Sequence, residues 1–208
     1  MNGLIICGVG RSGKTTLASM VAKRHDCTVI HTDCLITAFQ ETFPQLGIEH
    51  LNHTEKGKED FLNFVRVFCQ THIRYGQTNI VIEGGSMPLD YALKLFDKIL
   101  FKVVVLGMPN LTVDEWCAAI RKHDTEDENS YFQTDESLRA RAEKNISKAN
   151  EMFKSAKKLG IQIIETSGDR TGKFEDFVSK IKFSGKPKMT TQEIEQLKAD
   201  TDKRRNNK

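Results

Sequence analysis

Short runs of apolar residues alternate with segments of helical periodicity along most of this chain. Four of the five apolar runs, which lie at 4–7, 28–31, 80–82, 101–106 and 161–164, are nearly continuous, as in strands that are buried on both faces. Between and after them, apolar residues recur at helical spacing in 15–24, 61–76, 113–120, 138–159 and 174–181. This alternation predicts an α/β fold, in which helices cover both faces of a five-stranded parallel sheet in three αβα layers.

Two inserts interrupt the alternation. Residues 34–78 are too many for one crossover and carry an aromatic-rich helix of their own, with Phe61, Phe64, Val65 and Phe68 at core-like spacing. The polar and acidic stretch HDTEDENSYFQTD at 123–135 is the centre of a second insert, at about 121–137. Loops of this length in a compact domain are often functional. We therefore expect a substrate-binding insert at 34–78 and a lid at 121–137.

The charge of the chain is concentrated at its C-terminal end. Residues 184–208 hold seven of the 31 Lys and Arg residues and four of the 28 Asp and Glu residues, so residues 1–183 are neutral overall. The segment is polar and lacks aromatic residues, which predicts a mostly disordered tail behind one domain at 1–183. No nucleic-acid partner is expected, except through the basic end at 203–208.

Composition also bears on the compartment. No apolar run approaches the roughly 20 residues that cross a bilayer, and no secretory signal is visible. The five cysteines are scattered and lack C-x-x-C spacing. We expect a cytoplasmic protein without a membrane partner, a disulfide framework or a zinc site.

The stretch GVGRSGKT at Gly8–Thr15 satisfies the pattern of a phosphate-binding loop, after a buried-type strand and before a helix. The pattern arises by chance in a chain of this length on the order of once in a hundred; the alternative is a glycine-rich turn that merely starts a helix. Glycines at 8, 10 and 13 leave backbone N–H groups free to converge on phosphates, Lys14 would bridge β- and γ-phosphate oxygens, and Thr15 would coordinate Mg²⁺. The expected nucleotide-binding residues here are Gly8, Gly10, Arg11, Ser12, Gly13, Lys14, Thr15 and Thr16.

This loop resembles the Walker A loop of P-loop nucleoside triphosphatases. The N-K-x-D motif of switch GTPases and the apolar run ending in Asp of motor and AAA-type proteins are both absent from the sequence. Instead, Asp33 closes the second strand in VIHTD, and Glu83 closes the third in IVIEGG. Their order and spacing are similar to those of the nucleoside monophosphate kinase superfamily, and within it of the small-molecule kinases similar to shikimate and gluconate kinases. The resemblance covers residues 1–183 and implies the P-loop fold, ATP, Mg²⁺ and phosphoryl transfer.

One departure from the shikimate kinase pattern concerns the acceptor. In that family a D-x-D pair ends the second strand, whereas here His31 stands at the first position and Asp33 at the second. A glycine run after the third strand is represented by Gly84 and Gly85. The general arrangement is therefore similar, but shikimate itself is not implied as the substrate.

The resemblance also implies functions for the acidic residues and glycines that follow the second and third strands. Asp33 would orient the acceptor hydroxyl and accept its proton or hold a Mg²⁺-bound water, unless it is simply the N-cap of a helix that begins near Leu35. Glu83 would lie beside Mg²⁺ with Thr15, or else be a solvated strand end. Gly84 and Gly85 would let the substrate approach closely, or form an ordinary turn.

Phosphoryl transfer also needs positive charge on the far side of the phosphate. Arg121, just before the acidic insert, is the first choice among the arginines for this catalytic role, and a solvated helix end is an equal alternative; Arg139 and Arg141 begin the helix after the insert. Kinases of this superfamily hold adenine through the loop after the fifth strand. Here this loop contributes Thr166, Ser167 and Gly168, although a plain connecting loop would have the same appearance.

Three functions are compatible with these features. The preferred one is an ATP-dependent transferase that phosphorylates a hydroxyl of a small molecule. A nucleoside or nucleoside monophosphate kinase is an alternative, although EGGSMPLDY lacks the basic residue that monophosphate kinases commonly carry after the third strand. The third is a non-catalytic nucleotide-binding regulator or assembly module, against which the pair of Asp33 and Glu83 argues.

Overall fold

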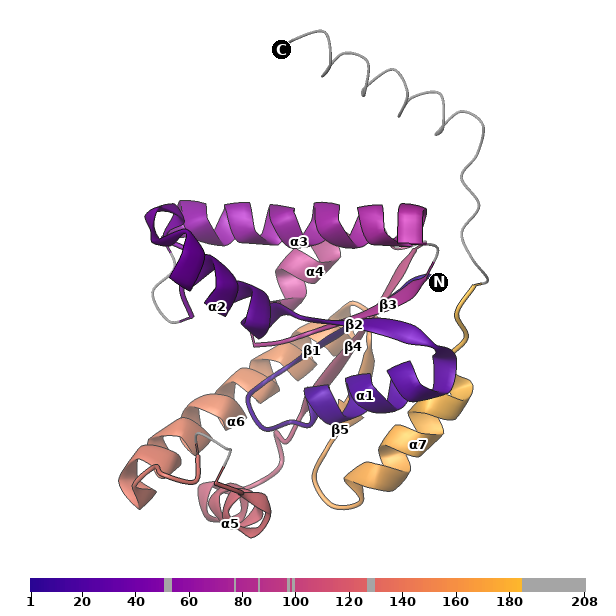
Figure 1. Ribbon diagram of the computed structural model, residues 1–208. Helices are drawn as coiled ribbons and strands as arrows, with labels where there is room; N and C mark the ends of the chain where they lie inside the picture. The colour runs from indigo at the N-terminus through magenta and orange to yellow at the C-terminus, as the bar shows by residue number, and fades with distance from the viewer. Residues whose placement is uncertain are drawn as a thin grey trace, which may run out of the picture.

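The centre of the molecule is a twisted sheet of five parallel strands (Figure 1). The computed structural model describes residues 1–184 except 51–53, 77, 86, 97, 99 and 127–129. The strands are β1 (Gly3–Gly8), β2 (Cys27–His31), β3 (Asn79–Glu83), β4 (Phe101–Gly107) and β5 (Gln162–Glu165). They lie in the order β2-β3-β1-β4-β5, and each neighbouring pair is parallel. The predicted α/β fold with five parallel strands is confirmed. The tail predicted at 184–208 lies outside the described residues from 185 onward.

Helices cover both faces of the sheet (Figure 1). They are α1 (Lys14–His25), α2 (Thr32–Thr42), the 3₁₀ turn η1 (Pro44–Leu46), α3 (Glu55–Gly76), α4 (Leu89–Leu95), α5 (Val113–His123), α6 (Asp135–Lys158) and α7 (Arg170–Lys180). Buried side chains of α3, α4 and α6 pack on one face, and those of α1 and α7 pack on the other. The segment expected to bind substrate contains α2, η1 and α3.

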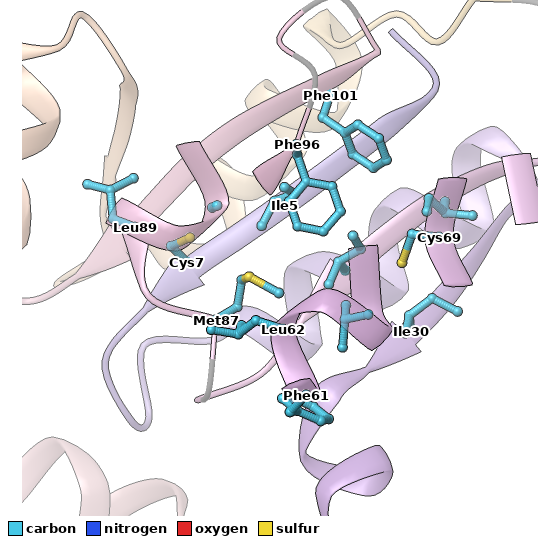
Figure 2. Close-up of a cluster of buried hydrophobic side chains, with 14 of the residues drawn as sticks. Ile5, Cys7, Ile30, Phe61, Leu62, Cys69, Met87, Leu89, Phe96 and Phe101 are labelled. Atoms are coloured by element: carbon cyan, nitrogen blue, oxygen red, sulfur yellow. The ribbon is translucent and has the colours of Figure 1, made fainter. Parts of the chain in front are cut away.

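Strand periodicity divides the core into two clusters. On β1, Ile5 and Cys7 point to the face covered by α3, α4 and α6, whereas Leu4 and Ile6 point to the face covered by α1 and α7. Figure 2 shows the first cluster, where side chains of α3 and α4 meet those of β1. Each central strand is thus buried on both sides, which explains its nearly continuous apolar sequence.

The aromatic residues of α3 face two ways. Phe61 and Val65 are buried against the sheet, as expected, but Phe64 and Phe68 are 37% and 38% exposed. The prediction that all four belong to the core was therefore wrong for two of them. At about 3.6 residues per turn, positions 64 and 68 are offset around the helix from 61 and 65 and lie beside its buried stripe.

The expected lid connects two well-anchored helices. Trp116 and Ile120 of α5 pack with Leu138 and Ala142 of α6 in a third buried cluster. A capping box between Thr112 and Glu115 starts α5, and the Thr134 hydroxyl accepts a hydrogen bond from the N–H of Ser137 at the start of α6. The chain between these helices therefore leaves from and returns to fixed points.

Residues 1 and 184 are adjacent. The backbone N–H of Ser184 donates to the carbonyl of Met1 at 2.6 Å, and the α-amino group of Met1 donates to the Ser184 hydroxyl at 2.8 Å. Among the described helices, none combines the length and the apolar character required to cross a membrane.

Candidate active site

The glycine-rich loop connects the end of β1 to the start of α1 at the carboxyl edge of the sheet (Figure 1). Gly13 is the N-cap of α1 with a φ of 87°, and a Cβ there would lie 3.0 Å from the Phe174 ring of α7. Arg11 has a φ of 65°, which is uncommon for a residue with a side chain. The loop has the strand–loop–helix context in which backbone N–H groups at a helix N-terminus bind an anion.

Lys14 lies within the loop rather than in solvent. Its ammonium group donates to the carbonyl of Val9 at 2.9 Å, and the Ser12 hydroxyl donates to the same oxygen at 2.8 Å. Burial lowers the pKa of Lys14, and the negative charges of Glu83 and Asp33 partly oppose this effect. An ammonium has three donors, so the contact with Val9 leaves Lys14 with donors for a phosphate oxygen.

The side chain of Glu83 contacts both the neighbouring strand β2 and the helix that follows the glycine-rich loop. His31 and Glu83 are paired positions on β2 and β3, and His31 Nδ1 lies 2.6 Å from Glu83 Oε1. The Thr15 hydroxyl donates to the same oxygen at 3.3 Å. The Glu83 side chain is 7% exposed, so this strand end is a buried carboxylate with two partners and not a solvated one.

Asp33 lies in the first turn of α2, whose N-cap is His31. The alternative that Asp33 is an N-cap is therefore wrong. Its carboxylate instead accepts the N–H of Gly85, with distances of 3.0 and 3.2 Å to its two oxygens. A Cβ at Gly84 would lie 1.9 Å from the Thr32 hydroxyl oxygen. The absence of a side chain at residue 84 thus lets the chain after β3 approach α2 closely enough to hold Asp33.

A Mg²⁺ ion would fit beside Thr15 and Glu83. A hydroxyl and a carboxylate are the hard oxygen ligands that Mg²⁺ prefers, and the ion usually retains waters and phosphate oxygens as its other ligands. Within the described ranges, His, Cys, Asp and Glu side chains do not gather in groups of three that could hold a metal by themselves. Thr15 and Glu83 would therefore supply two ligands of a Mg²⁺ ion, and waters and phosphate oxygens would supply the others.

A cavity of about 640 Å³ lies between the glycine-rich loop, α5 and the loop between β5 and α7. Most of the expected nucleotide-binding residues line it: Arg11, Gly13, Lys14, Thr15, Thr16, Thr166, Ser167 and Gly168. Gly8 and Gly10 instead line a second cavity, and Ser12 is buried inside the loop. The volume is within the range of small-molecule and cofactor sites.

The loop after β5 is held by its own contacts. The N–H and hydroxyl of Thr166 donate to the carbonyl of Gly107 at 2.9 and 3.2 Å, and the Ser167 N–H donates to Glu165 at 2.8 Å. Lys173 donates to the carbonyl of Ser167 at 2.9 Å. These hydrogen bonds tie the loop to β4 and α7 beside the cavity, and its Gly168 has a φ of 68°.

The three candidate arginines have different surroundings. Arg121 donates to the carbonyls of Ser130, Tyr131 and Gln133 and to the carboxylate of Asp135, all at 2.6–3.2 Å. It therefore joins α5 to the described residues 130–135, and its predicted catalytic role stays a prediction.

Arg139 forms an ion pair with Asp114 at the molecular surface. Arg141, in contrast, lies against the glycine-rich loop: a Cβ at Gly10 would be 3.5 Å from its guanidinium nitrogen. Arg141 is also close enough to Lys14 to contribute to the lowering of that residue's pKa. Among these arginines, Arg141 is the one that the structure places against the loop.

Sequence reasoning also missed a contact between the lid and the loop. Arg11 forms an ion pair with Asp124 at 2.7 Å, and the Ser130 hydroxyl donates to the same carboxylate oxygen at 2.6 Å. The helical period did contain a signal for Arg141 and Asn145, since both flank the buried stripe of Leu138, Ala142 and Ala149. Asp124 had no such signal, because it belongs to a run of acidic residues.

Comparison with known proteins supports the fold. No protein-family model and no curated protein matches the sequence. The structure is similar to a shikimate kinase from Bacteroides thetaiotaomicron, with 20% identity, a TM-score of 0.51, and coverage of 85% of this chain and 94% of that one. It is also similar to a shikimate kinase from Acinetobacter baumannii in complex with shikimate, with 15% identity, a TM-score of 0.51, and coverage of 86% and 90%. The chain therefore has the P-loop kinase fold, as the resemblance implied.

Proposed function

We propose that this protein is an ATP-dependent phosphotransferase that moves the γ-phosphoryl group to a hydroxyl of a small molecule. The observation that carries the proposal is the arrangement of two carboxylates around Lys14. Glu83 contacts Thr15 of the loop, Asp33 is held by Gly85, and both raise the pKa of Lys14 against the effect of its burial. A nucleotide-binding protein without catalysis needs the first carboxylate but has no use for the second.

Each side chain has a defined task in this reaction. Bound Mg²⁺ would supply charge neutralisation of the phosphate oxygens, and the Thr15 hydroxyl and Glu83 carboxylate would hold it. Lys14 would bind β- and γ-phosphate oxygens. Asp33 would orient the acceptor hydroxyl and accept its proton, while its hydrogen bond to Gly85 keeps the carboxylate in one orientation.

Arg141 is the proposed source of positive charge on the acceptor side. It follows the expected lid in sequence and lies close to Gly10, which supports the proposal that its guanidinium stabilises charge that develops on the transferred group. The adenine is proposed to occupy the cavity between α5 and the loop of Thr166–Gly168. The acceptor is proposed to carry little or no charge, because the segment from Glu83 to Tyr91 contains no arginine.

The proposal is tested by measuring ATP consumption with sugars, polyol acids, nucleosides and nucleoside monophosphates as acceptors. Asp33→Asn retains an oxygen that can accept the Gly85 N–H but lacks the charge. We expect acceptor-dependent turnover to fall by about 10²-fold or more while calorimetry shows ATP affinity within a few-fold of the wild type. Asp176→Asn, on the surface of α7, is the matched control and should not change turnover.

Three results would argue against the proposal. Unchanged turnover in Asp33→Asn would remove that residue from the mechanism, and Lys14→Ala with normal ATP binding would contradict the assigned phosphate site. ATP binding without turnover on any acceptor, together with a partner interaction lost on deletion of residues 184–208, would favour the non-catalytic regulator instead.

A further inference from the structure

A second cavity, of about 590 Å³, lies on the other side of the glycine-rich loop, between α4 and α6. We call it the α4–α6 groove. Its inner end is formed by Gly8, Val9, Gly10 and Gly85, and its outer end by Ser155 of α6 and by Leu159, the C-cap of that helix. The nucleotide cavity is lined by different residues, so the two cavities are separate sites that meet at the loop.

The inner end of the groove reaches the place where phosphoryl transfer is proposed. Gly85, which lines the groove, donates its N–H to the carboxylate of Asp33. Gly10, on the opposite side, belongs to the phosphate-binding loop and lies against Arg141. A molecule that fills the groove would therefore present one end between the proposed base and the loop.

The walls of the groove are mostly apolar. Val9, Met87 and Leu89 are 5%, 2% and 7% exposed, and Leu93 and Met152 extend the apolar surface away from the loop. Figure 2 shows Met87 and Leu89 on the side of the sheet to which Cys7 of β1 points. The charged residues of the lining, Asp90, Lys94, Lys148 and Glu151, are exposed and form its rim.

One buried polar atom is directed at the inner end. Nδ2 of Asn145 is shielded from solvent and has no hydrogen-bond partner among the described residues. This nitrogen would lie 3.4 Å from a Cβ at Gly10, and Asn145 is one of the residues that line the groove. An unpaired buried donor costs about 1–3 kcal/mol. A ligand with an acceptor atom near the loop would remove that cost.

We propose that the α4–α6 groove is the acceptor site and that the acceptor is an alcohol with an extended apolar body and a hydrogen-bond acceptor atom close to its hydroxyl. This inference rests on the proposed phosphotransferase function. The hydroxyl oxygen forms a bond to the γ-phosphorus, the bond from that phosphorus to the β–γ bridging oxygen breaks, and the proton passes to Asp33. The products are the phosphate monoester and ADP.

The length of the groove sets the length of the acceptor. Ten residues of α6 separate Asn145 from Ser155, which corresponds to about 15 Å at the helical rise. A polyhydroxylated acceptor would leave its hydroxyl groups unpaired against this apolar surface. An apolar body gains free energy with every methylene that the groove removes from water.

The experiment uses the full-length protein, [γ-³²P]ATP, and primary alcohols from 1-butanol to 1-decanol, with glucose and glycerol as polyhydroxylated probes. The kcat/KM should rise by about two- to fourfold per methylene until the chain fills the groove, and the two polyols should be the poorest acceptors. The kcat/KM should be higher for 2-hexyloxyethanol, which has an ether oxygen near its hydroxyl, than for 1-nonanol, which has the same chain length. Asn145→Leu should remove that difference.

Two serine variants on α6 test whether the dependence of kcat/KM on chain length arises in the α4–α6 groove. Ser155 is exposed and lines the groove, whereas Ser147 is exposed and does not. Ser155→Trp should lower kcat/KM for 1-decanol by at least about tenfold and leave 1-butanol unchanged, while Ser147→Trp should change neither. Equal effects of the two tryptophans, or no dependence on chain length, would overturn the acceptor assignment.

Binding measured without turnover separates this inference from the kinase proposal. Saturation-transfer NMR with 1-octanol should show binding that is weakened in Ser155→Trp and unchanged in Ser147→Trp. Such binding without transfer to any alcohol would refute both the phosphotransferase function and the acceptor role. Transfer to the polyols with no 1-octanol binding would refute the groove inference alone.

Discussion

The guanidinium of Arg11 lies 2.7 Å from a carboxylate oxygen of Asp124, and the Asp124 side chain is only 2% exposed. This ion pair joins the glycine-rich loop to the segment that follows α5. The Ser130 hydroxyl donates to the same oxygen, so a single carboxylate connects the glycine-rich loop with Ser130 and with the end of α5.

We expect Arg11→Met to lower the free energy of unfolding by about 3 kcal/mol, because it leaves a buried carboxylate without its cation. Arg139→Met breaks the exposed pair with Asp114 and should have a much smaller effect, because solvent screens an exposed ion pair. Urea unfolding at neutral pH measures both. Equal decreases in the free energy of unfolding for the two variants would show that the burial of Asp124 has no effect on the strength of its ion pair. In the double variant Arg11→Met/Asp124→Asn, part of the lost stability should be restored, because the buried carboxylate charge is removed.

The two glycines after β3 should differ sharply in their tolerance of a methyl group. Gly84 has a φ of 150° and no space beside Thr32, whereas a Cβ at Gly85 would lie 3.7 Å from the Asp33 oxygens. Gly84→Ala should therefore lower the free energy of unfolding by at least about 2 kcal/mol. Gly85→Ala should cost less than about 1 kcal/mol. Similar thermal unfolding of the two variants would contradict the close approach at Gly84.

His31 is expected to position Glu83. His31→Leu removes one of the two partners of that buried carboxylate and should lower the free energy of unfolding by about 1–2 kcal/mol. If Glu83 helps to hold Mg²⁺, calorimetric titration with ATP should also require more Mg²⁺ for half-maximal binding. His31→Gln, which can donate to Glu83, should restore part of both properties.

The control is His50→Leu, which removes an exposed histidine that contacts Thr37. Its effect on both measurements should be small. A Mg²⁺ requirement that is the same in His31→Leu and His50→Leu would show that Glu83 needs no support from His31.

The stability of the loop after β5 should depend on pH. Burial alone would raise the pKa of Glu165, but hydrogen bonds from Ser167 and Lys173 together lower it below its usual value. A carboxyl whose pKa is lower in the folded state stabilises the fold above its unfolded pKa of about 4.3, and this stability is lost as the pH falls through the folded value. Glu165→Gln should therefore reduce stability at pH 7 by up to about 1 kcal/mol.

Urea unfolding at pH 7 and at pH 3 tests this sign. The difference in the free energy of unfolding between the wild type and Glu165→Gln should be smaller at pH 3, where the wild-type carboxyl becomes protonated. A difference that grows on acidification would mean that the contacts of Glu165 favour its neutral form.

The sheet was predictable because its strands are buried on both faces, which leaves a continuous apolar signal in runs such as 101–106. Helix α4 was not predicted, since its seven residues are too few to display a period. The exposure of Phe64 and Phe68 was also missed. The apolar pattern of α3 does not say how much of the helix circumference the sheet covers.

Some features of the candidate site were also predictable from the sequence, and others were not. The loop residues were identifiable because a fixed spacing of glycine, lysine and threonine follows from the geometry of phosphate binding. The contacts of Arg121 and Arg141 depend on how α5 packs against α6, which no local pattern specifies. The burial of Asp124 likewise depends on Arg11, a residue 113 positions away in sequence.

The hydrogen bonds between Met1 and Ser184 hold these two residues together at the end of the sheet where β1 begins, and the glycine-rich loop lies at the opposite end where β1 ends. A short linker could therefore join residue 184 to residue 1, and the chain could be opened elsewhere to give a circular permutant. A reporter domain fused directly before residue 1 or directly after residue 184 would emerge away from the glycine-rich loop and would leave the approach to that loop unobstructed.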